Sequence, residues 1–255
     1  MDIESYNKLK QIDWFLRHPT LLPFVGDYYS QYRILHIGES HYLPQTKDNI
    51  KFNINYFNTN WWTTQCDNEF QDWKGWFNTA SVLYDYLDGH KSRAHNIFNN
   101  VVKSFSKVIL NKEISHISLS DKQLYKNFAF MNFYQMPSLR RGLKYWDSLI
   151  ESAKSVNNTE LAGKVFNECV NISTQVVDDV IDILKPNIVV FTSISAGNAY
   201  KDYNGKHKDD DNIIYTSHPS SSFSWNKTLK SLNGISGQEV LEEGLAKLKQ
   251  RLGCQ

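Results

Sequence analysis

Polar residues that can do acid–base or hydrogen-bonding chemistry follow two apolar segments that lie far apart in this chain. The first segment, "RILHIG", is followed by four such side chains, those of Glu39, Ser40, His41 and Tyr42. The second, within "NIIYTSHPSSSFSW", is followed by His218 and a run of hydroxyl groups. A neutral histidine can donate a hydrogen bond to an oxygen that gains negative charge, and a carboxylate such as that of Glu39 can act as a general base. The two segments together therefore indicate a reactive corner.

A third apolar run, "FAFMNFYQMP", contains Asn132 near the point where a strand is expected to end, which is also where the other two polar segments lie. Its carboxamide combines a donor with an acceptor, the pair that reads the edge of a nucleobase. After His218, the hydroxyls of Ser220 and Ser222 suit phosphate contacts, and the ring of Phe223 can stack on bases or wedge between them. An ordinary polar turn explains any one of these corners equally well. Three corners at one edge favour a functional site.

A sheet must bring these corners together. Four apolar runs are typical of buried strands, at 32–38, 128–137, 187–193 and 212–222. Helices are expected at 4–17, 70–88, 92–110, 139–155, 159–184 and 235–252, the last capped by Ser236. This alternation predicts an α/β fold, a three-layer α/β/α sandwich with a central four-stranded, mostly parallel sheet. Ligands bind at the carboxyl ends of the strands in such sheets, which is where the polar corners lie.

The chain has 255 residues, of which 41% are hydrophobic, enough for one well-packed core. We expect a single domain over 1–255, with an N-terminal helix and an enlarged insertion at 43–110. Within this insertion, the polar-aromatic stretch that holds Trp61 and Trp62 has no clear period. Those rings fit three roles, as core, as a lid over the site or as a surface for a partner.

Composition narrows the function classes. The chain has 28 Lys and Arg residues against 27 Asp and Glu, so its net charge does not favour nonspecific binding to nucleic acid. A local basic groove is compatible with this balance. The three cysteines, Cys66, Cys169 and Cys254, form no CxxC pair, and thiolates alone cannot hold zinc or an iron–sulfur cluster. We expect no cofactor and no metal. The charged N-terminus and the lack of a long apolar run predict a cytoplasmic protein without a membrane partner.

Taken together, "GESHY" and "HPSSSFSW" resemble the two signature motifs of the uracil-DNA glycosylase superfamily. Between them, "FMNFYQMPSLRR" resembles the segment with the family's base-recognising asparagine, and "KPNIVVFTSISAGNAY" resembles its third core strand and the following helix. The resemblance spans residues 30–232 in the family's order. It implies an α/β/α sandwich, DNA as the partner, and hydrolysis of the N-glycosidic bond of a flipped uracil or other altered base.

The resemblance also implies roles for single residues. His218 matches the histidine that stabilises the anionic leaving base, and Asn132 matches the residue that binds the base edge. Tyr42 matches the tyrosine that walls the pocket and excludes a 5-methyl group. Ser220 matches a serine that contacts DNA phosphate, and Phe223 lies near the position of the intercalating residue. We expect Ser222 to join Ser220 in binding DNA.

The first motif departs from the family's pattern. Ser40 stands where the most active branch has a water-activating aspartate, and a hydroxyl cannot serve as a carboxylate base at neutral pH. Glu39 is the neighbouring group that can supply this base. His41 replaces a proline and adds an ionisable group to the expected base pocket.

Two alternatives follow from these departures. The first is a non-catalytic member of the same fold that binds a nucleobase or nucleic acid. The second is a metal-dependent hydrolase with a Gly-Glu-x-His corner. On an extended segment Glu39 and His41 would point the same way, with His218 as the third ligand.

Overall fold

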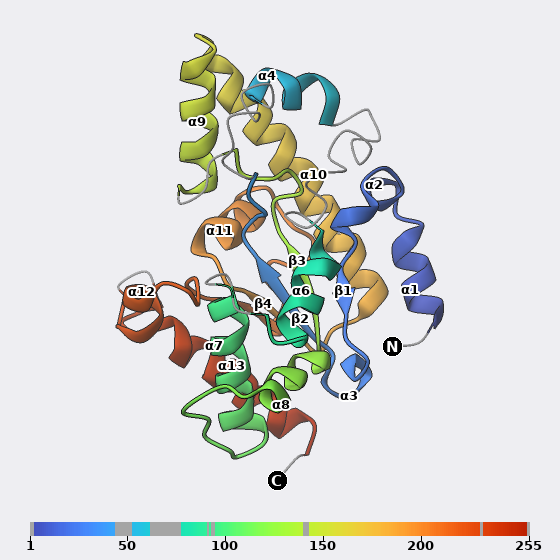
Figure 1. The fold of residues 1–255 in the computed structure, drawn as a ribbon, viewed down its shortest axis with the longest axis vertical. Helices are drawn as coiled ribbons and strands as arrows, with labels where there is room; N and C mark the ends of the chain where they lie inside the picture. The colour runs from blue at the N-terminus through green and yellow to red at the C-terminus, as the bar shows by residue number, and fades with distance from the viewer. Residues whose placement is uncertain are drawn as a thin grey trace.

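The computed structural model describes residues 3–43, 53–61, 78–90, 92, 95–139, 143–229 and 232–253, and for Ile3, Thr59, Asn60, Ser222 and Phe223 it describes the backbone alone. Its centre is one sheet with helices around it (Figure 1). The strand order of the sheet is β1-β3-β2-β4-β5. The strands are β1 (Phe24–Val25), β2 (Ile34–Gly38), β3 (Phe128–Asn132), β4 (Ile188–Phe191) and β5 (Ile213–Tyr215). Strands β2 to β5 are parallel, which confirms the predicted four-stranded parallel sheet.

The sheet has a fifth strand that the sequence analysis missed. β1 pairs antiparallel with the outer edge of β3 through Phe24 and Val25. A strand of two residues is too short to show an alternating or continuous apolar pattern. Apart from this strand, the fold is the predicted three-layer α/β/α sandwich.

Helices cover both faces of the sheet because successive strand residues point to opposite faces. Leu35 and Ile37 pack in the core shared with α1 (Ile3–Lys10), α2 (Asp13–Arg17), α9 (Tyr145–Ser155), α10 (Glu160–Leu184) and α11 (Ile194–Asp202). Ile34 and Phe128 pack in the core shared with α6 (Thr79–Leu87), α7 (Asn96–Ile109) and α13 (Gly237–Arg251). Shorter elements are η1 (Pro19–Leu21), α3 (Tyr29–Tyr32), α4 (Ile54–Tyr56), the π-helix η3 (Phe57–Trp61), α8 (Leu119–Lys122), η7 (Gln123–Asn127) and α12 (Ser222–Asn226).

Helix boundaries follow local capping. The helix expected at 4–17 is two helices, since α1 ends at Lys10 and α2 begins at Asp13. Ser236 caps α13 as predicted: its hydroxyl accepts from the Glu239 amide at 3.2 Å, and the Glu239 carboxylate accepts from the Ser236 amide at 2.7 Å. α6 begins at Thr79, after Asn78, whose side chain accepts from the amide of Ser81 at 2.9 Å. Residues 70–77, where that helix was expected to begin, lie outside the described part.

Trp61 belongs to the core. It is fully buried, its indole nitrogen donates to the Gln135 carbonyl at 3.1 Å, and its ring stacks on His18 with centroids 4.5 Å apart. Of the three roles considered for the aromatic stretch, the core role therefore holds for Trp61, while Trp62 lies outside the described residues.

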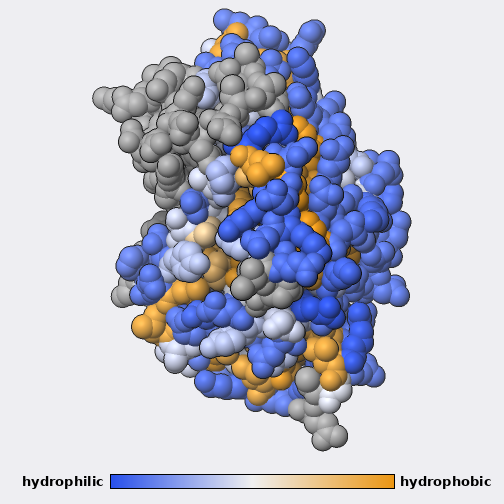
Figure 2. All heavy atoms as spheres, turned by 90° about the vertical axis from the view of Figure 1, so that its right-hand side faces the viewer, coloured by the Kyte–Doolittle hydropathy of each residue, from blue (hydrophilic) through white to orange (hydrophobic). Residues whose placement is uncertain are grey.

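The described surface seen in Figure 2 is mostly hydrophilic, with smaller hydrophobic areas between the hydrophilic ones. In the described ranges, no helix has both the length and the apolar character needed to cross a bilayer.

Candidate functional site

The candidate site lies at the carboxyl ends of the central parallel strands, where the chain changes the direction in which it adds strands to the sheet. β2 is the first of the parallel strands, with β3 on one side and β4 on the other, so the switch between the two directions lies between β2 and β4. Open α/β sheets bind ligands at this position. Glu39 follows β2, and its carboxylate accepts a hydrogen bond from the hydroxyl of Ser193, just after β4, at 2.8 Å. The predicted Glu39 corner therefore lies at the switch point.

Both oxygens of Glu39 are held. While Oε2 accepts from Ser193, Oε1 accepts from the backbone N–H of Tyr145 at the start of α9, at 3.4 Å. Ser193 is in turn the N-cap of α11, because its hydroxyl oxygen accepts from the amide of Ala196 at 3.2 Å. Three elements thus fix the carboxylate, and Ser193 and Tyr145 are site residues that the sequence analysis missed.

Asn132 lies across the end of β2. It is the register partner of Gly38, and a Cβ added to Gly38 would collide with Asn132 Oδ1 and come within 3.3 Å of the Phe130 ring. Glycine is therefore what allows the carboxamide to occupy this place. The Asn132 side chain is 9% exposed, and among the described residues its amide group has no hydrogen-bond partner. Its donor and its acceptor remain available for a ligand.

His218 presents one defined nitrogen. Its Nδ1 accepts from the backbone N–H of Ser220 at 3.3 Å and lies 2.7 Å from the Ser220 hydroxyl. Since an N–H can only donate, Nδ1 carries the lone pair and the proton of the neutral ring sits on Nε2. Burial lowers the pKa of His218, and the carboxylate of Glu39 opposes this shift in part. The imidazole is therefore a neutral donor that lies within electrostatic range of Glu39.

A second histidine supports the site from inside the sheet. His36 on β2 is fully buried, with Nδ1 2.6 Å from the Tyr125 hydroxyl and Nε2 2.7 Å from Thr192 Oγ1. Thr192 donates its own proton to the Ile37 carbonyl at 3.2 Å, so it accepts from His36 Nε2, and Tyr125 donates to Nδ1. Burial lowers the pKa of His36 to about 3, and the nearby His218 acts in the same direction. His36 is thus neutral and locked in one orientation beneath His218.

The loop that carries His218 is tied to the helix layer. Asn100 on α7 donates through its side-chain nitrogen to the carbonyl of Pro219 at 2.7 Å, and the amide of Ser221 donates to the carbonyl of His218 at 3.0 Å. Sequence reasoning missed Asn100, because only tertiary packing brings α7 to this loop.

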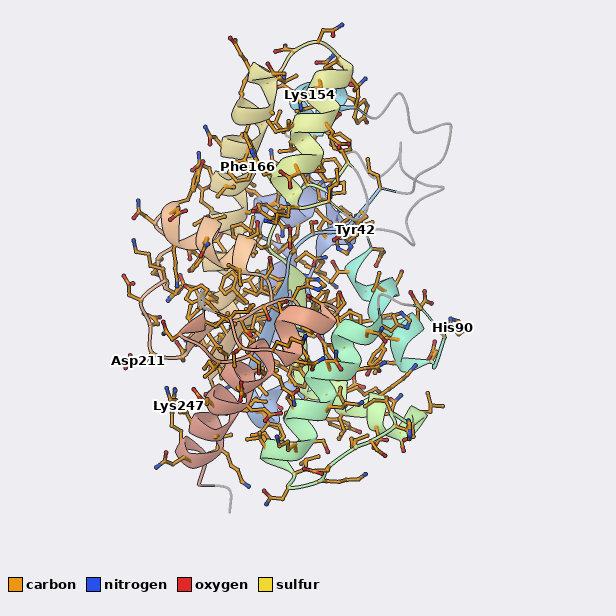
Figure 3. All side chains as sticks on the ribbon, turned by 90° about the vertical axis from the view of Figure 1, so that its left-hand side faces the viewer. Tyr42, His90, Lys154, Phe166, Asp211 and Lys247 are labelled. Carbon is orange, nitrogen blue, oxygen red and sulfur yellow. The ribbon has the colours of Figure 1, made fainter. Side chains whose placement is uncertain are left out.

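The remaining residues of the first motif point to different neighbours. The hydroxyl of Ser40 is buried and has no partner among the described residues. His41 is buried with Nε2 3.2 Å from Thr79 Oγ1, at the start of α6. Tyr42 forms a parallel bridge with Ser138. In Figure 3 it lies well apart from Asp211, a residue shortly before β5.

The structure therefore brings Glu39, Ser40, Asn132, His218 and Ser220 to the carboxyl edge of the sheet. Ser222 and Phe223 begin α12 on the same loop, and their side chains lie outside the described part of the chain.

Two stacked tyrosines border the site on the α9 side. The ring centroids of Tyr134 and Tyr145 are 3.8 Å apart, and the two stacked rings are nearly parallel, with an interplanar angle of 6°. The hydroxyl of Tyr134 lies 3.2 Å from that of Ser195 in α11, and burial raises the pKa of Tyr134, with the Glu39 carboxylate acting in the same direction. Tyr134 thus stays protonated as a rigid wall beside Glu39.

The geometry does not favour the metal-dependent alternative. Glu39 is held by Ser193 and Tyr145, whereas His41 contacts Thr79 on the opposite helix layer. Within the ranges that the structure describes, no group of three His, Cys, Asp or Glu side chains could hold a metal ion.

Comparison with known proteins gives no match: no family model, no curated protein and no solved structure matches this chain. A proposal for its function depends on the residues of the site.

Proposed function

We propose that this chain is a uracil-DNA-glycosylase-like protein that takes a flipped nucleobase at the carboxyl ends of β2, β3 and β5. One observation carries the proposal: among the described residues, the Asn132 carboxamide, the Ser40 hydroxyl and the His218 Nε2 have no protein partners at this edge. Of the three, the Ser40 hydroxyl is fully buried, and polar groups left unsatisfied inside a protein are costly and uncommon. Asn132 and His218 each keep some exposed surface through which a ligand can reach them. A ligand with several donors and acceptors along its edge would satisfy all three.

Uracil has the required edge. Its N3–H can donate to Asn132 Oδ1 while its O4 accepts from Asn132 Nδ2, a two-point contact that a rotated carboxamide also offers to hypoxanthine or xanthine. On the other side, His218 Nε2–H can donate to a ring carbonyl oxygen. That hydrogen bond strengthens as the base departs with its electron pair, which is the condition for lowering a barrier.

In the proposed reaction, a water oxygen bonds to C1′ of the deoxyribose while the C1′–N bond breaks, and the base leaves as an anion. The proton lost by the water passes to Glu39, whose oxygens keep lone pairs beyond those used by Ser193 and Tyr145. Ser40 would orient that water through its hydroxyl, which has no partner among the described residues. Ser220, Ser222 and Phe223 would contact the DNA around the flipped nucleotide.

A second candidate function is binding of a nucleobase in DNA without cleavage. It is favoured by Ser40, which stands where a carboxylate would activate water, and by the two donors already bonded to Glu39. A carboxylate that two donors already hold has fewer lone pairs left to accept from a water molecule.

The test is abasic-site formation on labelled single-stranded and mismatched oligonucleotides that carry uracil, hypoxanthine, xanthine or 5-hydroxymethyluracil. Wild type is compared with His218→Ala, Glu39→Gln and Asn132→Ala, and His116→Ala, which removes an exposed histidine away from the site, is the matched control. Cleavage by wild type and His116→Ala, lost in His218→Ala, supports the glycosylase. Binding without cleavage, weakened in Asn132→Ala, supports the second candidate. Folded protein that neither binds nor cleaves any of these substrates refutes both.

A further inference from the structure

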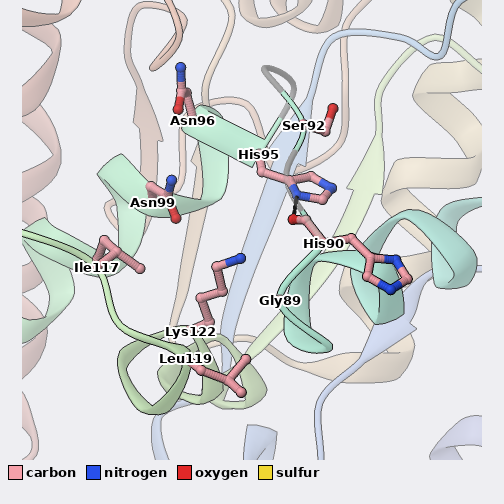
Figure 4. Close-up of a pocket in the computed structure, with 9 residues that line it drawn as sticks. All are labelled: Gly89, His90, Ser92, His95, Asn96, Asn99, Ile117, Leu119 and Lys122. Atoms are coloured by element: carbon pink, nitrogen blue, oxygen red, sulfur yellow. Dashed lines mark hydrogen bonds between the residues drawn. The ribbon is translucent and has the colours of Figure 1, made fainter.

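A cavity lies apart from the strand ends, in the helix layer formed by α6, α7 and α8. It has a volume of about 580 Å³ and is lined by Gly89, His90, Ser92, His95, Asn96, Asn99, Ile117, Leu119 and Lys122 (Figure 4). Pockets for small ligands typically measure about 300–1,000 Å³. Neither the proposed reaction nor the base-binding residues use this cavity.

Lys122 brings a positive charge to the lining of the cavity. Its ammonium group lies 5.0 Å from the centroid of the Tyr86 ring, and in the described part of the chain it forms no ion pair. Two carboxylates lie nearby: Asp121 accepts from the amide and hydroxyl of Ser118 and pairs with Lys112 at 3.3 Å, and Asp85 lies 3.4 Å from His90 Nδ1 and acts on His95 against Lys122. No described acidic side chain lines the cavity.

His95 faces the same space as Lys122. Its Nδ1 lies 2.9 Å from the His90 carbonyl, the dashed line in Figure 4, and a carbonyl can only accept. Nδ1 therefore carries a proton, and Nε2 is left to accept from a ligand or, once protonated, to donate to an anion. Figure 4 shows the end of the Lys122 side chain directed toward His95. A single anionic group placed between them would contact both.

The other side chains that line the cavity could contact the part of the ligand that lies beyond its anionic group. The side-chain oxygen of Asn99 is buried and without a partner among the described residues, so it calls for an N–H or O–H donor. Asn96 and Ser92 add further polar contacts, while Ile117 and Leu119 offer an apolar floor. This combination suits a molecule that carries an anion at one end and hydrogen-bond donors on a ring.

We propose that the α6–α7–α8 cavity binds a small phosphorylated molecule of about mononucleotide size, with the phosphate between Lys122 and His95 and a donor group on Asn99 Oδ1. This site is separate from the strand-end site, so it stands whether or not the protein cleaves DNA. The charge of Lys122 supplies affinity through charge-assisted hydrogen bonds, and Asn99 selects for a donor on the ligand.

The experiment is isothermal titration calorimetry with adenosine 5′-monophosphate, inorganic phosphate and adenosine as separate probes. We expect saturable binding of the monophosphate, weaker binding of phosphate and the weakest of adenosine. Lys122→Gln should reduce affinity for the monophosphate by about tenfold or more, and Asn99→Asp should reduce it through repulsion. Lys103→Gln, which removes a charge on α7 outside the lining, should leave affinity unchanged.

A second readout keeps the proposal independent of folding defects. In wild-type protein, bound phosphate should raise the pKa of His95, which burial now lowers, and NMR titration of the ring protons measures this shift. Absence of saturable binding to any probe would overturn the proposal. So would equal binding of adenosine and its monophosphate, or affinity unchanged in folded Lys122→Gln.

Discussion

Replacing Gly38 with alanine tests whether the carboxamide of Asn132 reads the base. The added methyl group would overlap Asn132 Oδ1 and come within 3.3 Å of the Phe130 ring. Asn132 must then turn away from the end of β2. Overpacking of this kind destabilises proteins by about 1–3 kcal/mol. Displacing the amide also removes two hydrogen bonds to the base at about 1 kcal/mol each, which corresponds to a loss of affinity of about thirtyfold.

The assay combines urea denaturation with binding of a uracil-containing oligonucleotide measured by fluorescence anisotropy. Gly163→Ala is the matched control, since a Cβ at this position in α10 meets no heavy atom within 4 Å. A helical glycine-to-alanine change there should stabilise the protein by about 0.5–1 kcal/mol and leave binding intact.

A double-mutant cycle isolates the clash. In an Asn132→Ala background the side chain that meets the new methyl group is shortened, so Gly38→Ala should cost less stability than it does in wild type and should not weaken binding further. If Gly38→Ala retains wild-type stability and wild-type affinity for the base, the reasoning about Asn132 is wrong.

Three further predictions concern the support of the site and the stability of the fold. Ser193→Ala should lower the free energy of unfolding by about 1 kcal/mol, because α11 loses its N-cap, and should reduce cleavage or binding, because Glu39 is released. Ser193→Thr should restore both. Urea denaturation measures the first effect and the oligonucleotide assay the second. Burial lowers the pKa of His18 from 6.5 to about 4 and the pKa of His36 from 6.5 to about 3. As the pH falls, both histidines are therefore protonated in the unfolded chain at a higher pH than in the folded protein. Stability should be full above pH 6.5 and should fall as the pH drops toward 4 and 3, by about 1.4 kcal/mol per pH unit for each histidine, and a flat profile of unfolding free energy would contradict this. Ser236→Ala should destabilise α13 by about 1 kcal/mol in thermal unfolding, with a null effect counting against the capping box.

Most of the sheet could be predicted because its strands are short apolar runs with clear ends. "NIVVF" follows Pro186, and "RILHIG" stops at Gly38, so both strands show in the sequence. β1 could not be predicted in the same way. Its two residues become a strand only because β3 leaves an edge on which they can pair.

The site was predicted only in part, for a related reason. Glu39, Asn132 and His218 each follow an apolar run in the sequence, and that position indicates a strand end. Ser193 and Asn100 act through contacts with segments far away along the chain, which no local pattern reveals. His36 had a faint signal, as the one polar residue within "ILHIG", but its two partners come from η7 and the end of β4.

The most direct test of the central claim is an NMR titration of the labelled protein with free uracil. The account predicts that the side-chain amide of Asn132 and the ring nitrogens of His218 show the largest shifts, with Nε2 carrying the proton, and that Asn132→Ala abolishes them. Shifts confined to Asn96 and Asn99 in the α6–α7–α8 cavity, or no saturable shift at the strand ends, would contradict the claim that this edge of the sheet binds a nucleobase.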